Sequence, residues 1–235
     1  MKIINFKSLP STNQYLKEHY NELDEYTIVK AENQTNGRGR MNRSWQVEPN
    51  TNLTFSILLK PDYDTNTMPL VSLIAGASVY LTLKQYIDCS IKWPNDIMAN
   101  NKKITGILAE GIFSSKMEAL IVGIGINVNQ VSFDEELTNK ATSLKKELNK
   151  DFDIDKLLQE FSINFEYLYQ DFLKGNNTYI KICKDNNYLK GKKVLYNDQE
   201  IEVIDITDNG NLKVLNDNNI MELHFGEVTL HNTYH

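Results

Sequence analysis

"KWPNDIMANNKKITGILAEGIF", from Lys92 to Phe113, is the stretch that decides the fold class. Pro94 keeps the residue before it extended, and the pair Asn100-Asn101 suits a tight turn between two strands. Three segments in and just before this stretch are rich in apolar and β-branched residues and predict strands: SIKW (90–93), DIMA (96–99) and KITGILAEGIF (103–113). A β-sheet is therefore expected in the middle of the chain.

Helices and further strands are expected on both sides of this stretch. Ser11 is a suitable N-cap for a helix, with Gln14 completing a capping box, and Pro69 suits a first helical position. The segments with helical spacing or a fully apolar composition are 11–23, 69–87, 153–174 and 178–189. The additional segments that predict strands are 26–33, 52–61 and 118–129.

The pattern changes near residues 187 to 191. Short strands then follow at regular intervals, separated by turn pairs such as Asn197-Asp198 and Asn209-Gly210. The strand segments are 192–197, 200–207, 211–216, 220–225 and 227–230. Evenly spaced short strands are typical of a small β-barrel or sandwich. The sequence thus predicts an α+β domain over 1–187 followed by a small all-β domain over 188–235.

Composition excludes several classes of protein. The chain of 235 residues carries a net charge of −6, which argues against broad nucleic-acid binding. No apolar run approaches the roughly 18 residues of a membrane span, and the first residues lack the apolar stretch of a signal peptide. Cys89 and Cys183 are isolated, without the spacing of a metal site or a disulfide framework. A cytoplasmic protein with reduced thiols is expected.

A basic loop, "NQTNGRGRMNRSW" (33–45), stands out in this acidic chain. Gly37 and Gly39 let the backbone approach a ligand closely, and arginines bind phosphate or carboxylate through paired hydrogen bonds. A solvated loop whose arginines pair with surplus acids is an equally good interpretation of the spacing alone. The loop is neither a P-loop, because no Gly-Lys-Ser/Thr follows, nor a dinucleotide fingerprint, because a strand follows it.

Three weaker patterns each have a structural explanation as well as a functional one. The turn after Trp93 presents Asn95 and Asp96 together, although a surface turn explains them well. Strand alternation places Lys102 and Lys103 on opposite faces, so that one can point into a cleft, whereas lone lysines usually lie at the surface. In "GIGIN" (123–127) the glycines permit a close neighbour and the asparagine offers hydrogen bonds, or the strand is simply tightly packed.

Taken together and in order, these motifs resemble the biotin–protein ligases: "STNQYL", "NGRGRMNRSW", "KWPNDI", a lysine before "GILAE", and "GIGINVN". The resemblance spans the chain and implies a class II synthetase-like mixed β-sheet flanked by helices, followed by an SH3-like β-barrel. Members that act as repressors carry an N-terminal winged helix-turn-helix. Here Ser-Thr-Asn starts ten residues from Met1, so we expect the short form, with no specific DNA binding.

The resemblance implies a two-step reaction. Biotin and ATP give biotinyl-5′-AMP, and biotin then passes to a lysine of a biotin carboxyl carrier domain. Mg²⁺ is expected on the phosphates, held mostly by substrate and water because the sequence shows no metal cage. The expected partners are ATP, biotin and the carrier domain of a carboxylase, with no membrane and with a homodimer as an open possibility.

Site residues carried over from the resemblance form three groups. The biotin group is Ser11, Thr12, Asn13, Gln34, Gly37, Arg38, Gly39, Arg40, Lys103 and Gly106. The ATP and adenylate group is Arg40, Arg43, Trp45, Lys92, Asn95, Lys103 and Asn127. The catalytic group comprises Lys103 and Arg40, which would stabilise the transition state, and Asp96, which would orient or deprotonate the incoming lysine.

Two rival functions are kept open. A lipoate or octanoate ligase uses a similar scaffold but a different arginine-glycine motif. A non-catalytic regulator that binds biotinyl-AMP is the rival from another class, and the acidic charge and the expected lack of a DNA-binding domain argue against it.

Overall fold

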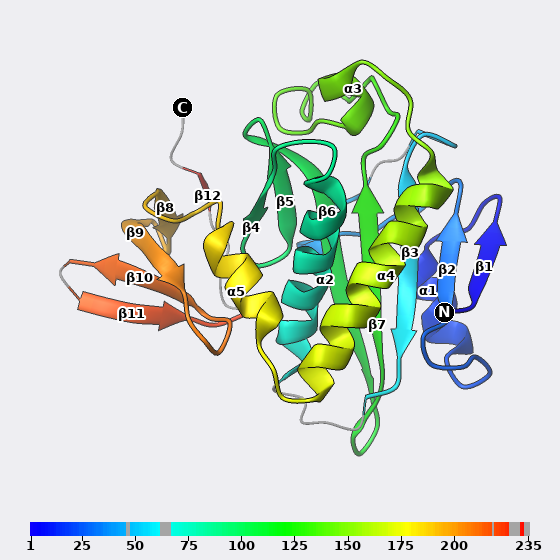
Figure 1. Ribbon diagram of the computed structural model, residues 1–235, viewed down its shortest axis with the longest axis horizontal. Coiled ribbons are helices and arrows are strands. Elements are labelled where there is room, and N and C mark those ends of the chain that lie inside the picture. The colour runs from blue at the N-terminus through cyan, green and yellow to red at the C-terminus, as the bar shows by residue number, and fades with distance from the viewer. Residues whose placement is uncertain (46–47, 62–66, 218, 226–230, 233–235) are drawn as a thin grey trace.

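The computed structural model describes residues 1–45, 48–61, 67–217, 219–225 and 231–232 of the chain. Figure 1 shows a central sheet with helices packed on it and a smaller sheet to one side. The central sheet has seven strands in the order β1-β2-β3-β7-β6-β5-β4. Its strands are β1 (Ile3–Phe6), β2 (Ile28–Ala31), β3 (Leu53–Leu59), β4 (Ser90–Lys92), β5 (Asp96–Ala99), β6 (Lys102–Phe113) and β7 (Met117–Ile126).

Antiparallel pairing dominates this sheet, and the parallel pair β1–β2 makes it mixed. The predicted turn at Asn100-Asn101 is confirmed, because both residues have positive φ (47° and 61°). A bulge beside Ile97 separates Lys103 from Thr105 in the β5–β6 pairing, so the ladder shifts where β6 begins. The predicted mixed α+β fold is confirmed.

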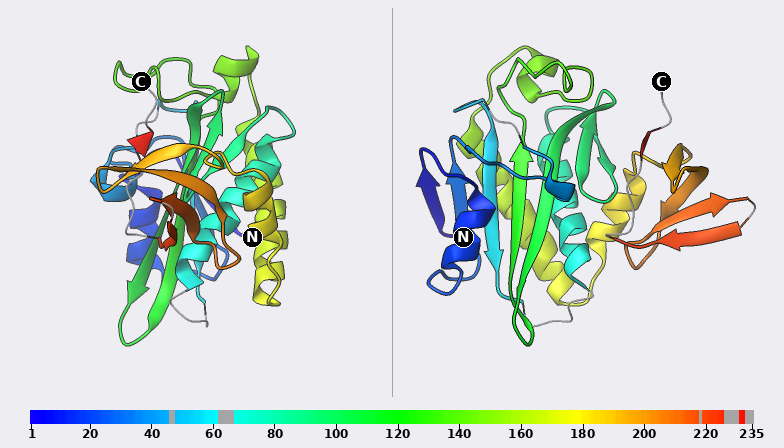
Figure 2. Two further views of the ribbon diagram at one scale, coloured as in Figure 1. Left: turned by 90° about the vertical axis from the view of Figure 1, so that its left-hand side faces the viewer. Right: turned by 180° about the vertical axis from the view of Figure 1, so that it is seen from behind.

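The helices cover the two faces of the sheet unequally. Figure 2 shows α2 and α4 together on one face, with α1 and the basic loop on the other. Helix α2 is buried over most of its circumference because the sheet lies on one side and α4 and α5 on the other. The helices are α1 (Thr12–His19), α2 (Met68–Leu83), α3 (Leu144–Leu148), α4 (Ile154–Leu173) and α5 (Thr178–Asp185).

Some local predictions were wrong. Strand β1 and helix α3 were missed, because segments of four and five residues carry too little periodicity. Helix α1 ends at His19 instead of continuing to residue 23. The Ser11 side chain does cap it by accepting from Gln14 N, but the Gln14 amide bonds to Glu18 and does not complete a capping box. Pro69 is the second residue of its helix.

The small sheet follows α5 and is antiparallel, with the order β11-β10-β9-β8-β12. Its strands are β8 (Lys193–Tyr196), β9 (Gln199–Ile206), β10 (Leu212–Asn216), β11 (Asn219–Leu223) and β12 (His231–Asn232). The segment expected as a strand at 227–230 lies outside the described residues. Apolar side chains of both sheets join one core, and the buried Trp93 donates from Nε1 to Gly210 O at 2.9 Å. The turn between β4 and β5, which contains Trp93, is thereby tied to the small sheet.

Among the helices in the described parts of the chain, none combines the length and apolar character needed to cross a membrane.

Candidate active site

A cavity of about 1240 Å³ is lined in part by the start of α1 and by the basic loop. Figure 2 shows these two segments on the face of the sheet opposite α2 and α4. The cavity walls come from the start of α1, the basic loop, the β4–β5 turn, the glycine-bearing parts of β6 and β7, and the segment before α3. It also reaches Tyr188 and Lys192 at the start of the small sheet. Its position is set by the fold, since segments distant in sequence meet where β6 and β7 run side by side.

One end of the cavity is polar, uncharged and buried. The Thr12 backbone N–H donates to Gln34 Oε1 at 2.7 Å, and the Thr12 hydroxyl lies 2.6 Å from that of Ser56. Ser56 in turn donates to Asn13 Oδ1 at 2.5 Å. Buried hydroxyls and amides are costly unless hydrogen-bonded, so this chain fixes the side chains at the helix start. Ser11, with 8% of its surface exposed, completes this end.

Asn13 is held in one orientation by groups outside the cavity. Its Nδ2 donates to Glu110 Oε2 at 2.7 Å, and a carboxylate can only accept, so the amide oxygen must face Ser56. Lys17 pairs with the same carboxylate at 2.5 Å. A Cβ on Gly123 would lie 2.3 Å from Asn13 Oδ1, so only glycine leaves room for this side chain.

The other end of the cavity is cationic. Lys103 Nζ lies 2.7 Å from Asp96 Oδ1, and Arg40 Nη1 donates to Asn95 Oδ1 at 3.1 Å. Asn95 is itself fixed by donating to Ile107 O at 2.8 Å. Burial lowers the pKa of Arg40, and the nearby Asp96 opposes that shift. This end therefore concentrates positive charge around a single ion pair.

Lys92 belongs to the same end of the cavity. Burial is the main cause that lowers its pKa, and the charges of Lys103, Lys192 and Arg43 lower it further, against the opposing effect of Asp96. Like charges this close repel one another unless an anion lies between them. The arrangement is thus suited to a ligand with several negative charges.

The basic loop is folded over the cavity. Gly39 N donates to Arg43 O at 2.7 Å and Trp45 N to Gly37 O at 2.9 Å. The Trp45 indole lies on β6 and β7 where both carry glycine: a Cβ on Gly125 would come within 2.3 Å of the ring. Its buried Nε1 has no hydrogen-bond partner among the described residues, which leaves a donor available inside the site.

The structure brings nearly all of the predicted site residues to this one cavity. The predicted residues that line it are Ser11, Thr12, Asn13, Gln34, Arg38, Gly39, Arg40, Arg43, Trp45, Lys92, Asn95, Asp96, Lys103, Gly106 and Asn127. Gly37 does not line the cavity; it is buried against Trp45 O, where a Cβ would lie at 2.6 Å. The Asn127 amide donates to Thr142 O at 3.0 Å and so anchors the segment before α3.

Residues that were missed from the sequence include two that support the site from behind and two that line it near the small sheet. Ser56 and Glu110 hold Asn13 at the polar end, while Tyr188 and Lys192 line the cavity next to the small sheet. Ser56 had a signal, because it and Thr54 are the polar residues of an otherwise apolar strand. The other three gave none, since only the tertiary fold brings them near the motifs.

The chain's own carboxylates do not gather into a metal cage. In the described ranges, no group of three or more His, Cys, Asp or Glu side chains is placed to hold a metal ion. Asp96, the acidic residue at the cationic end, is already paired with Lys103.

Comparison with known proteins gives a consistent result. A family model described as the biotin/lipoate A/B protein ligase family matches residues 5–127. The structure of the biotin protein ligase from Aquifex aeolicus in complex with biotin and ATP is 31% identical, covers 99% of both chains, and superposes with a TM-score of 0.89.

Curated relatives agree over shorter stretches. The bifunctional ligase/repressor BirA of Bacillus spizizenii is 38% identical over 69% of this chain and 51% of that protein. Biotin–protein ligase 2 of Arabidopsis thaliana is 25% identical over 92% of this chain and 70% of that protein. The chain spans about half the length of the curated Bacillus relatives it matches. With the family match and the likeness in fold along its whole length, the chain belongs to the biotin/lipoate A/B protein ligase family and is similar throughout to a biotin protein ligase.

Proposed function

We propose that the chain is an ATP-dependent biotin–protein ligase. In the first step a carboxylate oxygen of biotin attacks the α-phosphorus of ATP, the bond to the β-phosphate breaks, and pyrophosphate leaves. In the second, the amine of a carrier lysine attacks the carbonyl carbon of biotinyl-5′-AMP, the bond to AMP breaks, and the amine loses a proton. The observation that carries the proposal is one cavity with a buried neutral polar end and a cationic end.

The ureido ring of biotin would bind at the polar end of the cavity. This ring has two N–H donors and one carbonyl acceptor, which hydroxyl and amide side chains can satisfy in a buried site. Ser11, Thr12, Asn13 and Gln34 supply such groups at the start of α1 and in the adjoining loop. The valeryl carboxylate then extends toward Arg40 and Lys103 at the cationic end.

ATP occupies the cationic end and the space beneath the basic loop. Arg40, Arg43, Lys92 and Lys103 would offset the repulsion between the biotin carboxylate and the α-phosphate, which is the main electrostatic obstacle to the first step. Trp45 offers the adenine ring an aromatic face. Mg²⁺ would enter as part of the MgATP substrate, held by phosphate oxygens and water.

Asp96 would take its role after the adenylate has formed. Its carboxylate lies 2.7 Å from Lys103 Nζ. When Lys103 turns to the phosphate and the reacting carbonyl, the carboxylate becomes available to the ammonium of the incoming carrier lysine. We propose that it orients that amine, with deprotonation as the further role that kinetics must test.

The direct test is transfer of labelled biotin to a purified biotin carboxyl carrier domain in the presence of ATP. The proposal predicts stoichiometric pyrophosphate release and a labelled carrier lysine. Unlabelled biotin should compete with the label, and unlabelled lipoate should not. Preferential use of lipoate would make the chain a lipoate ligase, and biotinyl-AMP binding without pyrophosphate release or transfer would make it a regulator.

A further inference from the structure

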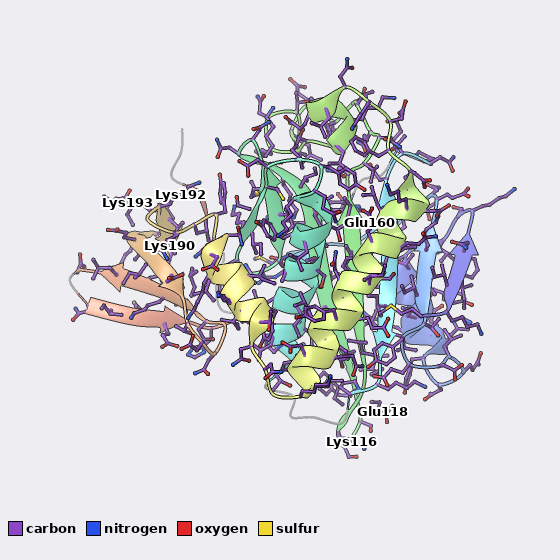
Figure 3. All side chains as sticks on the ribbon, viewed as in Figure 1. Lys116, Glu118, Glu160, Lys190, Lys192 and Lys193 are labelled. Atoms are coloured by element: carbon purple, nitrogen blue, oxygen red, sulfur yellow. The ribbon has the colours of Figure 1, made fainter. Side chains whose placement is uncertain are left out.

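Lys192 is one of three lysines clustered where the small sheet begins. Figure 3 shows Lys190, Lys192 and Lys193 close together at this junction. Lys190 pairs with Asp205 at 2.7 Å, and Lys193 pairs with Glu200 at 2.7 Å, both on the small sheet itself. Lys192 points another way: it lines the cavity, and its Nζ lies 3.3 Å from the centre of the Tyr188 ring. The three adjacent lysines therefore divide into two that brace the small sheet and one that reaches the site.

Lys192 extends the set of cations that line the cavity. Its charge acts on Lys92, which also lies near Lys103. Burial lowers the pKa of Lys192 itself, so its ammonium is partly withdrawn from water. Lys92 is thus near two further cations: Lys103, which is paired with Asp96, and Lys192, which directly precedes β8. Among the described lining residues, Asp96 and Glu136 are the acidic ones.

This extension matches ATP better than it matches the adenylate. The adenylate carries one phosphate, whereas ATP carries two more beyond it, and these leave together as pyrophosphate. Arg40 and Lys103 lie at the centre where the carboxylate and α-phosphate meet in the proposed reaction. A further cation close enough to act on Lys92 is available to the part of ATP that leaves.

We propose that Lys192 binds the β- and γ-phosphates of ATP and the departing pyrophosphate. The inference rests on the proposed ligase function and adds to the nucleotide site a residue that directly precedes β8 of the small sheet. When the biotin oxygen bonds to the α-phosphorus, the bridging oxygen takes the electron pair of the breaking bond onto pyrophosphate. An ammonium there stabilises the charge that develops, and it has no part in the second step, from which pyrophosphate is absent.

The two half-reactions separate this role from a structural one. In Lys192→Gln, the KM for MgATP in pyrophosphate release should rise at least roughly tenfold, because a charge-assisted contact to phosphate is lost. Inhibition by added pyrophosphate should weaken in parallel. Transfer from chemically prepared biotinyl-AMP to a purified carrier domain should keep its wild-type rate. Lys192→Arg should restore much of the affinity for MgATP.

Lys190→Gln and Lys193→Gln are the matched controls, since they remove neighbouring charges whose partners lie on the small sheet. Both should keep the wild-type KM for MgATP. The proposal is overturned if Lys192→Gln leaves that KM unchanged, if both controls raise it equally, or if transfer from biotinyl-AMP falls as much as adenylation. Failure of the proposed function looks different, because the wild-type protein would then neither release pyrophosphate nor transfer biotin.

Discussion

The ammonium group of Lys103 lies 2.7 Å from the carboxylate of Asp96, joining β6 to β5 at the cationic end of the cavity. The neighbouring Lys102 pairs opposite Ala99 in the sheet and does not line the cavity. Two adjacent lysines of equal charge therefore differ in direction, as strand alternation predicts. This difference provides an internal control for the proposed chemistry.

Lys103→Ala should reduce the rate of adenylation by roughly 100-fold or more, because a charge that stabilises the transition state is removed from a partly buried site. Lys102→Ala should retain nearly full activity. Pyrophosphate release measures both, and thermal unfolding checks that each variant is folded. Equal activity of the two variants would show that the lysine facing the cavity has been wrongly assigned.

Gly125→Ala should disturb the nucleotide end of the site without greatly changing biotin binding. The new Cβ would lie 2.3 Å from Trp45 Cε2, so the indole must move from its place on the sheet. We expect a higher KM for MgATP and a changed Trp45 fluorescence, with biotin affinity measured by calorimetry close to wild type.

Gly76→Ala is the control for that substitution. Gly76 lies in α2 on the opposite face of the sheet, and its new Cβ would approach no atom closer than 3.8 Å. Alanine should stabilise the helix by roughly 0.5–1 kcal/mol relative to glycine and leave the kinetics unchanged. A Gly125→Ala enzyme with normal use of MgATP would remove Trp45 from the proposed adenine site.

The basic loop should become more resistant to protease when biotinyl-AMP binds. Arg38 and Arg43 are exposed, and the loop carries like charges whose repulsion a bound phosphate would relieve. Ordering each residue costs about 1–2 kcal/mol of backbone entropy, which the ligand contacts would offset. Trypsin cleavage after these arginines should slow with ligand, whereas cleavage after Lys116, in the distant β6–β7 turn of Figure 3, should not. Equal protection at all three positions, or at none, would contradict ligand-linked closure.

Long, strongly patterned elements were predictable from sequence, and short ones were not. The β6–β7 hairpin and helix α4 have clear apolar patterns of ten residues or more. Helix α3, with five residues, and β1, with four, obtain their stability from neighbours that a local pattern does not contain. The fold class depends on the first kind of element, which is why it could be predicted.

The same distinction applies to the site. The motif around Lys103 is contiguous in sequence and could be recognised. The contact between Asn13 and Glu110 joins residues 97 positions apart, so Glu110 has no local feature that marks it as a support for the polar end. Lys192 is likewise indistinguishable in sequence from Lys190 and Lys193, and only the different directions of their side chains separate them.

Both cysteines should resist thiol reagents in the folded protein. Burial raises the pKa of Cys89 from 9.0 to about 12, and that of Cys183 from 9.0 to about 12. Burial therefore favours the neutral thiols in the folded protein. Their contribution to the free energy of unfolding is constant below pH 9. It is lost as the pH rises from 9 toward 12, because the thiols of the unfolded chain ionise first. Reaction with a disulfide reagent at pH 8 should be slow and should accelerate only with unfolding by urea. Rapid labelling of the native protein would contradict this burial.

The contact between the small sheet and α2 should stabilise the nucleotide end of the site. Gly210 has a φ of 82°, and a Cβ there would lie 2.6 Å from Leu70 Cδ2. Gly210→Ala would therefore combine backbone strain with a steric clash beside Trp93, whose indole bonds to Gly210 O. We expect lower stability in urea and a larger loss of adenylation than of biotin affinity.

Gly191→Ala provides the matched comparison, because Gly191 has a φ of 73° but no atom within 4 Å of a new Cβ. It should incur only the left-handed strain of about 1–2 kcal/mol, whereas Gly210→Ala should lose a further 1–3 kcal/mol or so through overpacking. Equal stability of the two alanine variants would contradict the predicted overpacking at Gly210.

Removal of residues 189–235 takes away the carbonyl of Gly210 to which Trp93 donates. Biotin binding by the folded remainder should persist, while adenylation and transfer should fall sharply. A folded truncation with full transfer activity would show that the small sheet is not needed at the nucleotide end.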